Sequence, residues 1–191
     1  MIATDKKEYN KEKIIRLLRD TKRTGIDDLV EWMIGTDFFE APASTRLDFH
    51  GCHEGGLADH SLNVYEAFTD KVEIYGLDIR DDEATIASIC HDFCKIDIYV
   101  PNVLKGGQVS VPMPYVKKED FPFGHGDKSV LVASKHIDMT KNEALMIRWH
   151  MGRYDGEWDT YKSKVERICP AVIAFQYADD EASKFMDYRV R

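Results

Sequence analysis

The stretch ICHDFCKI, residues 89–96, decides how the rest of this sequence is interpreted. It ends an apolar face that begins at Ile86 and has the i, i+3, i+4, i+7 spacing of a helix. His91 and Asp92 therefore stand side by side near a helix end, next to Lys95. Adjacent helical side chains diverge by roughly 100°, so this pair can reach one ion only if the ion lies between them, most easily over the helix end.

Four other segments each offer one imidazole or carboxylate beside a predicted buried face. Taken singly, each residue is most simply a hydrogen-bonded core or surface side chain. Taken together, they could converge on one internal site, because helices of a bundle project ligands inward from separate segments. The predicted metal ligands are His60, His91, Asp92, His125, His150 and Asp179.

This ligand set is a mixture of four imidazoles and two carboxylates. Such a set suits Mn, Fe, Co, Ni or Zn better than Mg or Ca. Asp92 could bridge two ions roughly 3.5–4 Å apart, the arrangement that polarises a phosphoryl oxygen and activates water together. We therefore expect a divalent transition metal, with two ions as the favoured count.

Helical patterns dominate the chain, and one segment interrupts them. Residues 98–116 carry three prolines and a Gly106-Gly107 turn between two β-prone arms, which predicts a small exposed hairpin or flap. Segment 41–56 is predicted to be a loop, and its Gly55-Gly56 pair indicates crowding where the loop meets the next helix. The sequence thus predicts an all-α bundle with one β-hairpin.

Helix ends can be placed from capping residues. Asn10 could cap the first helix, and Gly25 precedes the second. Further helices are expected from Leu57 to about Ile74, where Gly76 stops the helix, from Asp82 to Phe93, after Asp127 as a cap, after a capping box that begins at Thr140, and from Pro170 to about Tyr188.

Composition limits the class of protein. The 191 residues are 43% hydrophobic and 31% charged, which fits one globular domain, and no apolar run is long enough to span a bilayer. The polar first residues are unlike a signal peptide, so a cytoplasmic location is expected. The net charge of −8 disfavours a broad nucleic-acid surface, although residues 1–23 hold eight Lys/Arg against four Asp/Glu.

The histidine and aspartate motifs resemble the HD superfamily of metal-dependent phosphohydrolases. Its pattern is a His, then a His-Asp pair, then a distant Asp, which are found here in GGLADHSLNV, ICHDFCKI and FQYADDEAS. FGHGDKS and IRWHMG look like the extra histidines of subgroups with two or more metals. The chain is also similar to the HD domains of YhaM-type 3′→5′ exoribonucleases and YqeK-type diadenosine tetraphosphate hydrolases.

The resemblance covers roughly residues 41–185. It implies an HD domain over 41–191 with residues 1–40 as amino-terminal helices packed on its core, one compact domain overall. It also implies that Asp92 and Lys95 serve catalysis. Many members read HDxGK, whereas Cys94 takes the place of that glycine here, so the backbone after the pair could differ.

Basic and polar residues near the motifs are candidates for binding an anionic substrate: Arg46, His50, Lys128 and Arg153. The resemblance implies hydrolysis of a phosphate ester or anhydride, with a nucleotide as the favoured substrate. Two alternatives are a 3′→5′ exonuclease on single-stranded nucleic acid, which the acidic body disfavours, and a non-catalytic nucleotide-binding protein, which would not need six intact ligands. A homo-oligomer is left open.

Overall fold

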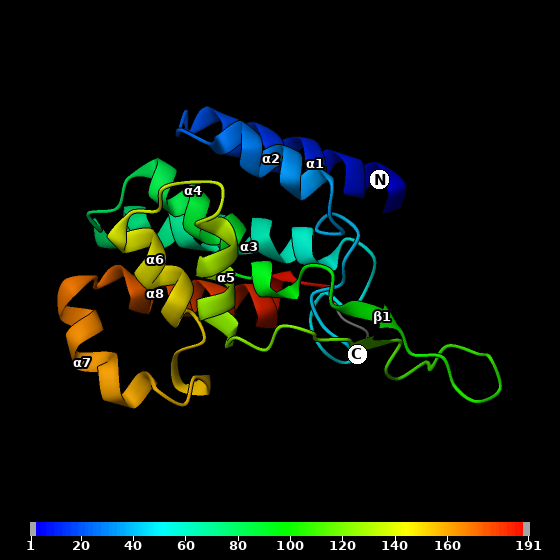
Figure 1. The fold of residues 1–191 in the computed structure, drawn as a ribbon. Helices are drawn as coiled ribbons and strands as arrows, with labels where there is room; N and C mark the ends of the chain where they lie inside the picture. The colour runs from blue at the N-terminus through cyan, green and yellow to red at the C-terminus, as the bar shows by residue number, and fades with distance from the viewer. Residues whose placement is uncertain (1–2, 189–191) are drawn as a thin grey trace.

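The computed structural model describes the backbone of residues 3–188 and the side chains of residues 6–188. Eight α-helices and one two-stranded sheet make up most of this part of the chain (Figure 1), which confirms the all-α class with a small hairpin. The helices are α1 (Ala3–Asp20), α2 (Ile26–Ile34), α3 (Gly56–Tyr75), α4 (Asp81–Cys90), α5 (His125–Ala133), α6 (Lys141–Trp149), α7 (Trp158–Ile168) and α8 (Ala171–Glu181). Short 3-10 helices η1 (Phe93–Lys95) and η2 (Gly152–Tyr154) follow α4 and α6, and a π-helical turn η3 (Ala182–Met186) follows α8.

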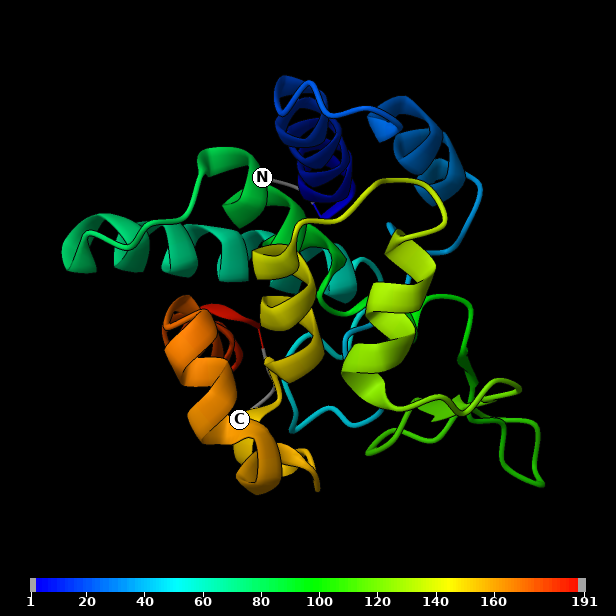
Figure 2. The same cartoon turned by 60° about the vertical axis from the view of Figure 1, so that its left-hand side comes forward.

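Helix α3 is the centre of the bundle. It packs against α4 on one side and α8 on another, while α6 bridges α4, α5 and α8. Figures 1 and 2 both place α1 and α2 along one side of this group and α7 on the opposite side. Phe68 and Phe175 pack edge to face where α3 meets α8, and both are fully buried. In the part of the chain described, no helix is both long and apolar enough to cross a membrane.

The amino-terminal helices share the main apolar core. Ile14 and Leu18 of α1 and Leu29 of α2 are fully buried in the same cluster as the side chains of α3 and α4. Arg23, between α1 and α2, donates to Glu143 at 2.6 Å and to Asp82 at 2.9 Å. Since Glu143 is fully buried, this ion pair fixes the α1–α2 turn against the starts of α4 and α6.

The hairpin predicted for residues 98–116 is present and exposed. Strand β1 (Tyr99–Pro101) pairs antiparallel with β2 (Tyr115–Lys117), with Val100 opposite Val116, and an isolated bridge joins Val103 to Val109. The segment projects from the bundle in both ribbon views. It contacts the body through the Leu47 amide, which donates to the Pro112 carbonyl at 3.2 Å.

The double glycine before α3 relieves crowding, as its position suggested. Gly55 has a φ of 79°, which other residues rarely adopt. A Cβ on Gly56 would lie 1.9 Å from the Gly51 carbonyl oxygen. The 41–56 loop can therefore close tightly over the first turn of α3, and α3 ends at Tyr75 with Gly76 as its C-cap, the predicted stop.

Several predicted helix ends are confirmed and others are wrong. The capping box at Thr140 is confirmed, since Thr140 Oγ accepts the Glu143 amide and Glu143 accepts the Thr140 amide. Asn10 is not a cap: α1 begins at Ala3, and the Asn10 amide instead bonds Asp59 of α3. Asp127 is not a cap either, because α5 begins two residues earlier at His125 and Asp127 pairs with Arg148.

The ends of two more helices differ from the prediction. Helix α4 ends at Cys90 rather than Phe93, because the chain tightens into η1 after the His91-Asp92 pair. The last helix ends at Glu181 and widens into η3, so it stops short of Tyr188. Helix α7 was not predicted.

Candidate metal centre

Three side chains from three helices meet at the middle of the bundle. His60 lies in the second turn of α3, His91 directly follows α4, and Asp179 lies near the end of α8. The two imidazole Nε2 atoms are 3.2 Å apart, and His60 Nε2 is 3.1 Å from Asp179 Oδ1. Both histidines are buried, while Asp179 is partly exposed. Three potential ligand atoms thus point at one small volume.

Asp92 extends this group towards a second one. Its Oδ2 is 3.4 Å from His91 Nε2 and 3.6 Å from His60 Nε2. Its Oδ1 is 2.7 Å from His125 Nε2, at the start of α5, and 3.7 Å from His150 Nε2, just after α6. The two oxygens of one carboxylate therefore face two different sets of histidines, and the structure brings all six predicted ligands together.

Hydrogen bonds on the far side of the rings fix which nitrogen faces inward. His91 Nδ1 donates to the Ser88 carbonyl at 2.8 Å, and His150 Nδ1 donates to the Ile147 carbonyl at 2.7 Å. A carbonyl oxygen can only accept, so each Nδ1 carries a proton and each Nε2 is the nitrogen directed into the cluster. Buried, inward-facing ring nitrogens of this kind fit a metal ion, and these groups could hold one.

The pKa values of two histidines in the cluster are raised well above the ordinary value of a histidine. Burial opposes the charge on His60, but the hydrogen bonds that it donates to Asp179 and Asp187 outweigh burial and raise the pKa of His60 to about 10. Burial likewise opposes the charge on His125, and its hydrogen bonds to Asp92 and Cys94 raise its pKa to about 9.

Asp92 stays ionised despite its burial. Desolvation favours its neutral form, yet the positive charge of Lys95 and the neighbouring histidines hold the pKa of Asp92 well below its usual range. Lys95 Nζ lies 2.6 Å from Asp92 Oδ2. The lysine is itself buried, and the facing carboxylate raises its pKa against that desolvation. The pair thus keeps a charged carboxylate at the centre of the site.

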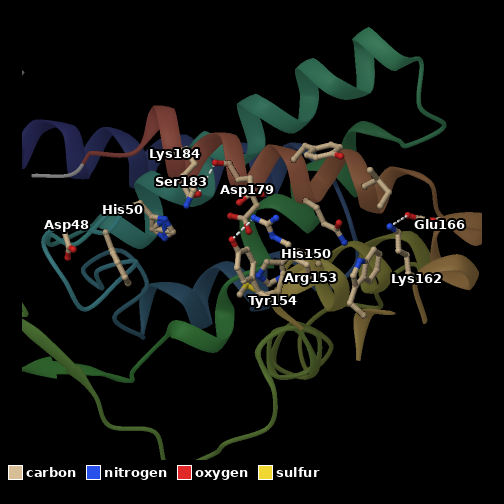
Figure 3. A pocket seen from close by; sticks show the side chains of 18 residues that line it. Asp48, His50, His150, Arg153, Tyr154, Lys162, Glu166, Asp179, Ser183 and Lys184 are labelled. Atoms are coloured by element: carbon tan, nitrogen blue, oxygen red, sulfur yellow. Dashed lines mark hydrogen bonds and ion pairs between the residues drawn. The ribbon is translucent and has the colours of Figure 1, made fainter. Parts of the chain in front are cut away.

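A cavity of about 660 Å³ opens onto this cluster (Figure 3). Asp179 and His150 line it together with Arg153 and Tyr154 of η2. The volume falls within the range of small-molecule sites. The cavity therefore gives a small ligand access to the histidine and aspartate group.

Of the four predicted substrate contacts, two line the cavity and two do not. His50 and Arg153 line the cavity. Arg46 is exposed and pairs with Asp48, and Lys128 is buried against Glu119 at 2.8 Å, so neither is among the residues that line this cavity. A role of Arg46 or Lys128 in binding substrate stays a prediction.

Asp187 contacts the cluster and was not predicted from the sequence. Its Oδ2 accepts from His60 Nδ1 at 2.7 Å, and its Oδ1 accepts from Asn63 at 2.7 Å. It lies in extended backbone after η3, where nothing in the local pattern distinguishes it from a surface aspartate. Gln176 was also missed: it caps the α6 carboxyl end by donating to the Trp149 carbonyl at 2.8 Å.

One curated protein shares most of its length with this chain. The dihydroneopterin 2′,3′-cyclic phosphate phosphodiesterase of Methanocaldococcus jannaschii is 30% identical over 182 residues, which cover 87% of this chain and 69% of that protein. The chain belongs to the family of this phosphodiesterase. No protein-family model and no solved structure matches it. The six clustered side chains are therefore the candidate centre of a phosphodiesterase-family member.

Proposed function

We propose that this protein is a metal-dependent phosphohydrolase of the HD superfamily that cleaves a phosphate ester or anhydride of a nucleotide or nucleotide-like small molecule. The observation that carries the proposal is the convergence of four imidazoles on the two oxygens of Asp92. The relationship to a cyclic phosphodiesterase supports the choice of phosphorus chemistry. Residues 41–191 would form the catalytic domain, with residues 1–40 packed on it.

The proposed centre would hold two divalent transition ions, with Asp92 as a ligand available to both. His60, His91 and Asp179 would serve one ion, and His125 and His150 the other. When bound, such ions polarise a phosphoryl oxygen and lower the pKa of water. Mn, Fe, Co, Ni and Zn suit this donor set better than Mg.

The chain's own residues would position and neutralise the reacting groups. Lys95 keeps Asp92 ionised from a distance of 2.6 Å, so that both carboxylate oxygens remain available as ligands. His50 stacks on His60 with ring centroids 4.7 Å apart and faces the cavity, where it could contact a phosphate oxygen. The exposed Arg153 also lines the cavity and could serve as a second anion contact.

A small molecule fits the cavity better than a nucleic-acid strand. Basic Arg153, Lys162 and Lys184 are interspersed with acidic Asp48, Glu166 and Asp180 along its walls. A strand-binding groove needs a continuous basic track for the phosphates. An exonuclease is therefore the less favoured candidate. A single-stranded oligonucleotide should be included among the substrates tested below.

The test is hydrolysis of a substrate panel by metal-free protein reloaded with Mn, Fe, Co, Ni, Zn or Mg. The panel should contain nucleoside 2′,3′-cyclic phosphates, a pterin 2′,3′-cyclic phosphate, nucleoside triphosphates and dinucleoside polyphosphates. We expect transition-metal-dependent turnover of at least one, lost in His91→Ala and Asp92→Ala together with most of the bound metal. Full activity of a metal-free Asp92→Ala protein would refute the proposal.

Metal stoichiometry tests the number of ions independently of activity. Wild type should saturate at two ions per chain, and His125→Ala and His150→Ala should each move the value towards one while helicity is kept. Saturation of wild type at one ion with every metal would leave His125 and His150 as phosphate contacts or proton donors instead.

A further inference from the structure

Cys94 is the one described cysteine whose sulfur lies among potential metal ligands. Its Sγ, an oxygen of Asp92 and a ring nitrogen of His125 all lie within 4.8 Å of one another. Cys52, Cys90 and Cys169 are also free and buried, but none belongs to such a group among the described residues. Replacing one of the other cysteines therefore serves as a control for replacing Cys94, because it removes a buried thiol from outside these groups.

Two hydrogen bonds fix Cys94 relative to His125. The Cys94 amide donates to Ser129 Oγ at 3.1 Å, and Ser129 Oγ in turn donates to the His125 carbonyl at 3.3 Å. The short helix η1 is thereby tied to the first turn of α5. Cys94 is 4% exposed, so its sulfur faces the protein interior rather than bulk water.

We propose that Cys94 is a thiolate ligand of the ion on the His125 side of Asp92, a role that rests on the metal centre proposed above. Cys94 Sγ shares one group of potential ligand atoms with His125 and an oxygen of Asp92 and would be a third protein donor there, whereas His150 is grouped with His91 and Asp92. As the sulfur–metal bond forms, the thiol proton leaves to solvent, and nothing is oxidised or reduced. The two ions would then sit in different environments, one with nitrogen and oxygen donors and one with an added sulfur.

The added sulfur changes which metal this side prefers. Thiolate is a soft ligand that favours Zn, Fe or Co over Mn and Mg. We expect the His125 side to discriminate against Mn and Mg more strongly than the His60 side does. Replacing Cys94 with an oxygen donor or with glycine should reduce that discrimination.

Cobalt absorbance provides a readout that does not depend on turnover. Metal-free full-length protein is titrated with Co²⁺ while the near-ultraviolet thiolate-to-cobalt charge-transfer band and the visible ligand-field bands are followed. We expect the charge-transfer band in wild type and in Cys169→Ser, and its loss in Cys94→Ser and Cys94→Gly. In both Cys94 variants, the affinity for the more weakly bound of the two Co²⁺ ions should fall by about tenfold or more.

The possible outcomes separate this inference from the metal centre itself. If wild type binds Co²⁺ with ligand-field bands but no charge-transfer band, Cys94 is not a ligand, although the metal centre stands. A band that persists in Cys94→Ser would equally overturn the inference. If wild type binds no Co²⁺ at all, the proposed metal centre has failed, and the inference falls with it.

Discussion

Each ring nitrogen of His60 contacts a carboxylate. Asp187 contacts Nδ1 at 2.7 Å, and Asp179 contacts Nε2 at 3.1 Å. Through its contact with Nδ1, Asp187 fixes the ring and increases its basicity, as carboxylates behind metal-bound histidines do. It is therefore a positioning residue for the proposed centre.

Asp187→Asn should weaken metal binding without abolishing it. Asparagine can still accept from His60 Nδ1, but it removes the negative charge that contributes to the raised pKa of His60. We expect a loss of about 10–100-fold in metal affinity, measured by competition with a chromophoric chelator. Asp78→Asn removes an equal charge at an exposed position and should leave affinity unchanged. Equal affinities for wild type and Asp187→Asn would contradict the positioning role.

At the scale of residues, the sequence predicted the histidines and aspartates that belong to motifs. It missed a residue whose role depends only on its tertiary contact. Four histidines and two aspartates could be singled out because motif spacing and predicted buried faces marked them. Asp187 could not, because its contact with His60 depends on how the chain turns after η3. Arg46 and Lys128 looked equally suited to an anion, yet each is already paired with a nearby carboxylate.

Helices α5 and α6 cross closely enough to need a glycine at the contact. A Cβ on Gly126 would lie 2.2 Å from the Arg148 carbonyl oxygen, a backbone atom that cannot rotate away. His125 precedes this glycine, and His150 follows the contacted arginine by two residues. The close approach therefore sets the separation of the two histidines.

Gly126→Ala should push α5 away from α6. We expect a destabilisation of about 1–3 kcal/mol from overpacking, measured by urea unfolding, and a metal content reduced towards one ion per chain. Gly156→Ala is the matched control, because a Cβ there would meet nothing within 4 Å. Two ions retained at wild-type affinity in Gly126→Ala would show that this contact does not set the site.

The hairpin should exchange its amides faster than the helices beside it. Its ladder is short, and Val103, Val109 and Val111 are exposed, so little apolar burial opposes local opening. Hydrogen exchange followed by mass spectrometry should show residues 98–116 labelling well before α4 and α5. Because Pro112 bonds the loop that contains His50, substrate should slow exchange in the hairpin. Uniformly slow exchange without substrate would contradict its role as a flap.

At the scale of elements, helix existence was easier to predict than helix ends. The box at Thr140 and the stop at Gly76 lie in the local sequence and were confirmed. Asn10 and Asp127 looked like caps, but tertiary partners on α3 and α6 take their side chains. Helix α7 escaped prediction because its eleven residues are mostly polar and bury only Trp158 and Val165.

Over the whole molecule, metal and protons compete for the same nitrogens. In metal-free protein His60 and His125, with pKa values near 10 and 9, carry protons at neutral pH. Both values lie above the ordinary 6.5. The stability that these protonated groups contribute is therefore fully present below about pH 6.5 and lost as pH rises through 9 to 10. His150 differs: burial first, and then the charges of His91 and His125, lower its pKa to about 3, so it is already neutral.

Metal binding should therefore release protons and become tighter as pH rises. Each displaced proton strengthens apparent affinity by about tenfold per pH unit below the group's pKa. At fixed free metal above the dissociation constant, that adds about 1.4 kcal/mol of stabilisation per tenfold. The metal-induced rise in Tm should accordingly increase from pH 6 to pH 8. Calorimetry in buffers of different ionisation enthalpy should count close to three protons released when both ions bind, one each from His60, His125 and the Cys94 thiol, and close to two in Cys94→Ser.

Asp92→Ala removes the carboxylate shared by both halves of the site. This variant should show a small metal-induced rise in Tm with little dependence on pH. A wild-type Tm shift that stays constant from pH 6 to pH 8, with no proton release, would mean that the ions bind elsewhere than at His60 and His125. Because free metal is held constant by a chelating buffer at each pH, the comparison reports the site's own protons rather than metal hydrolysis.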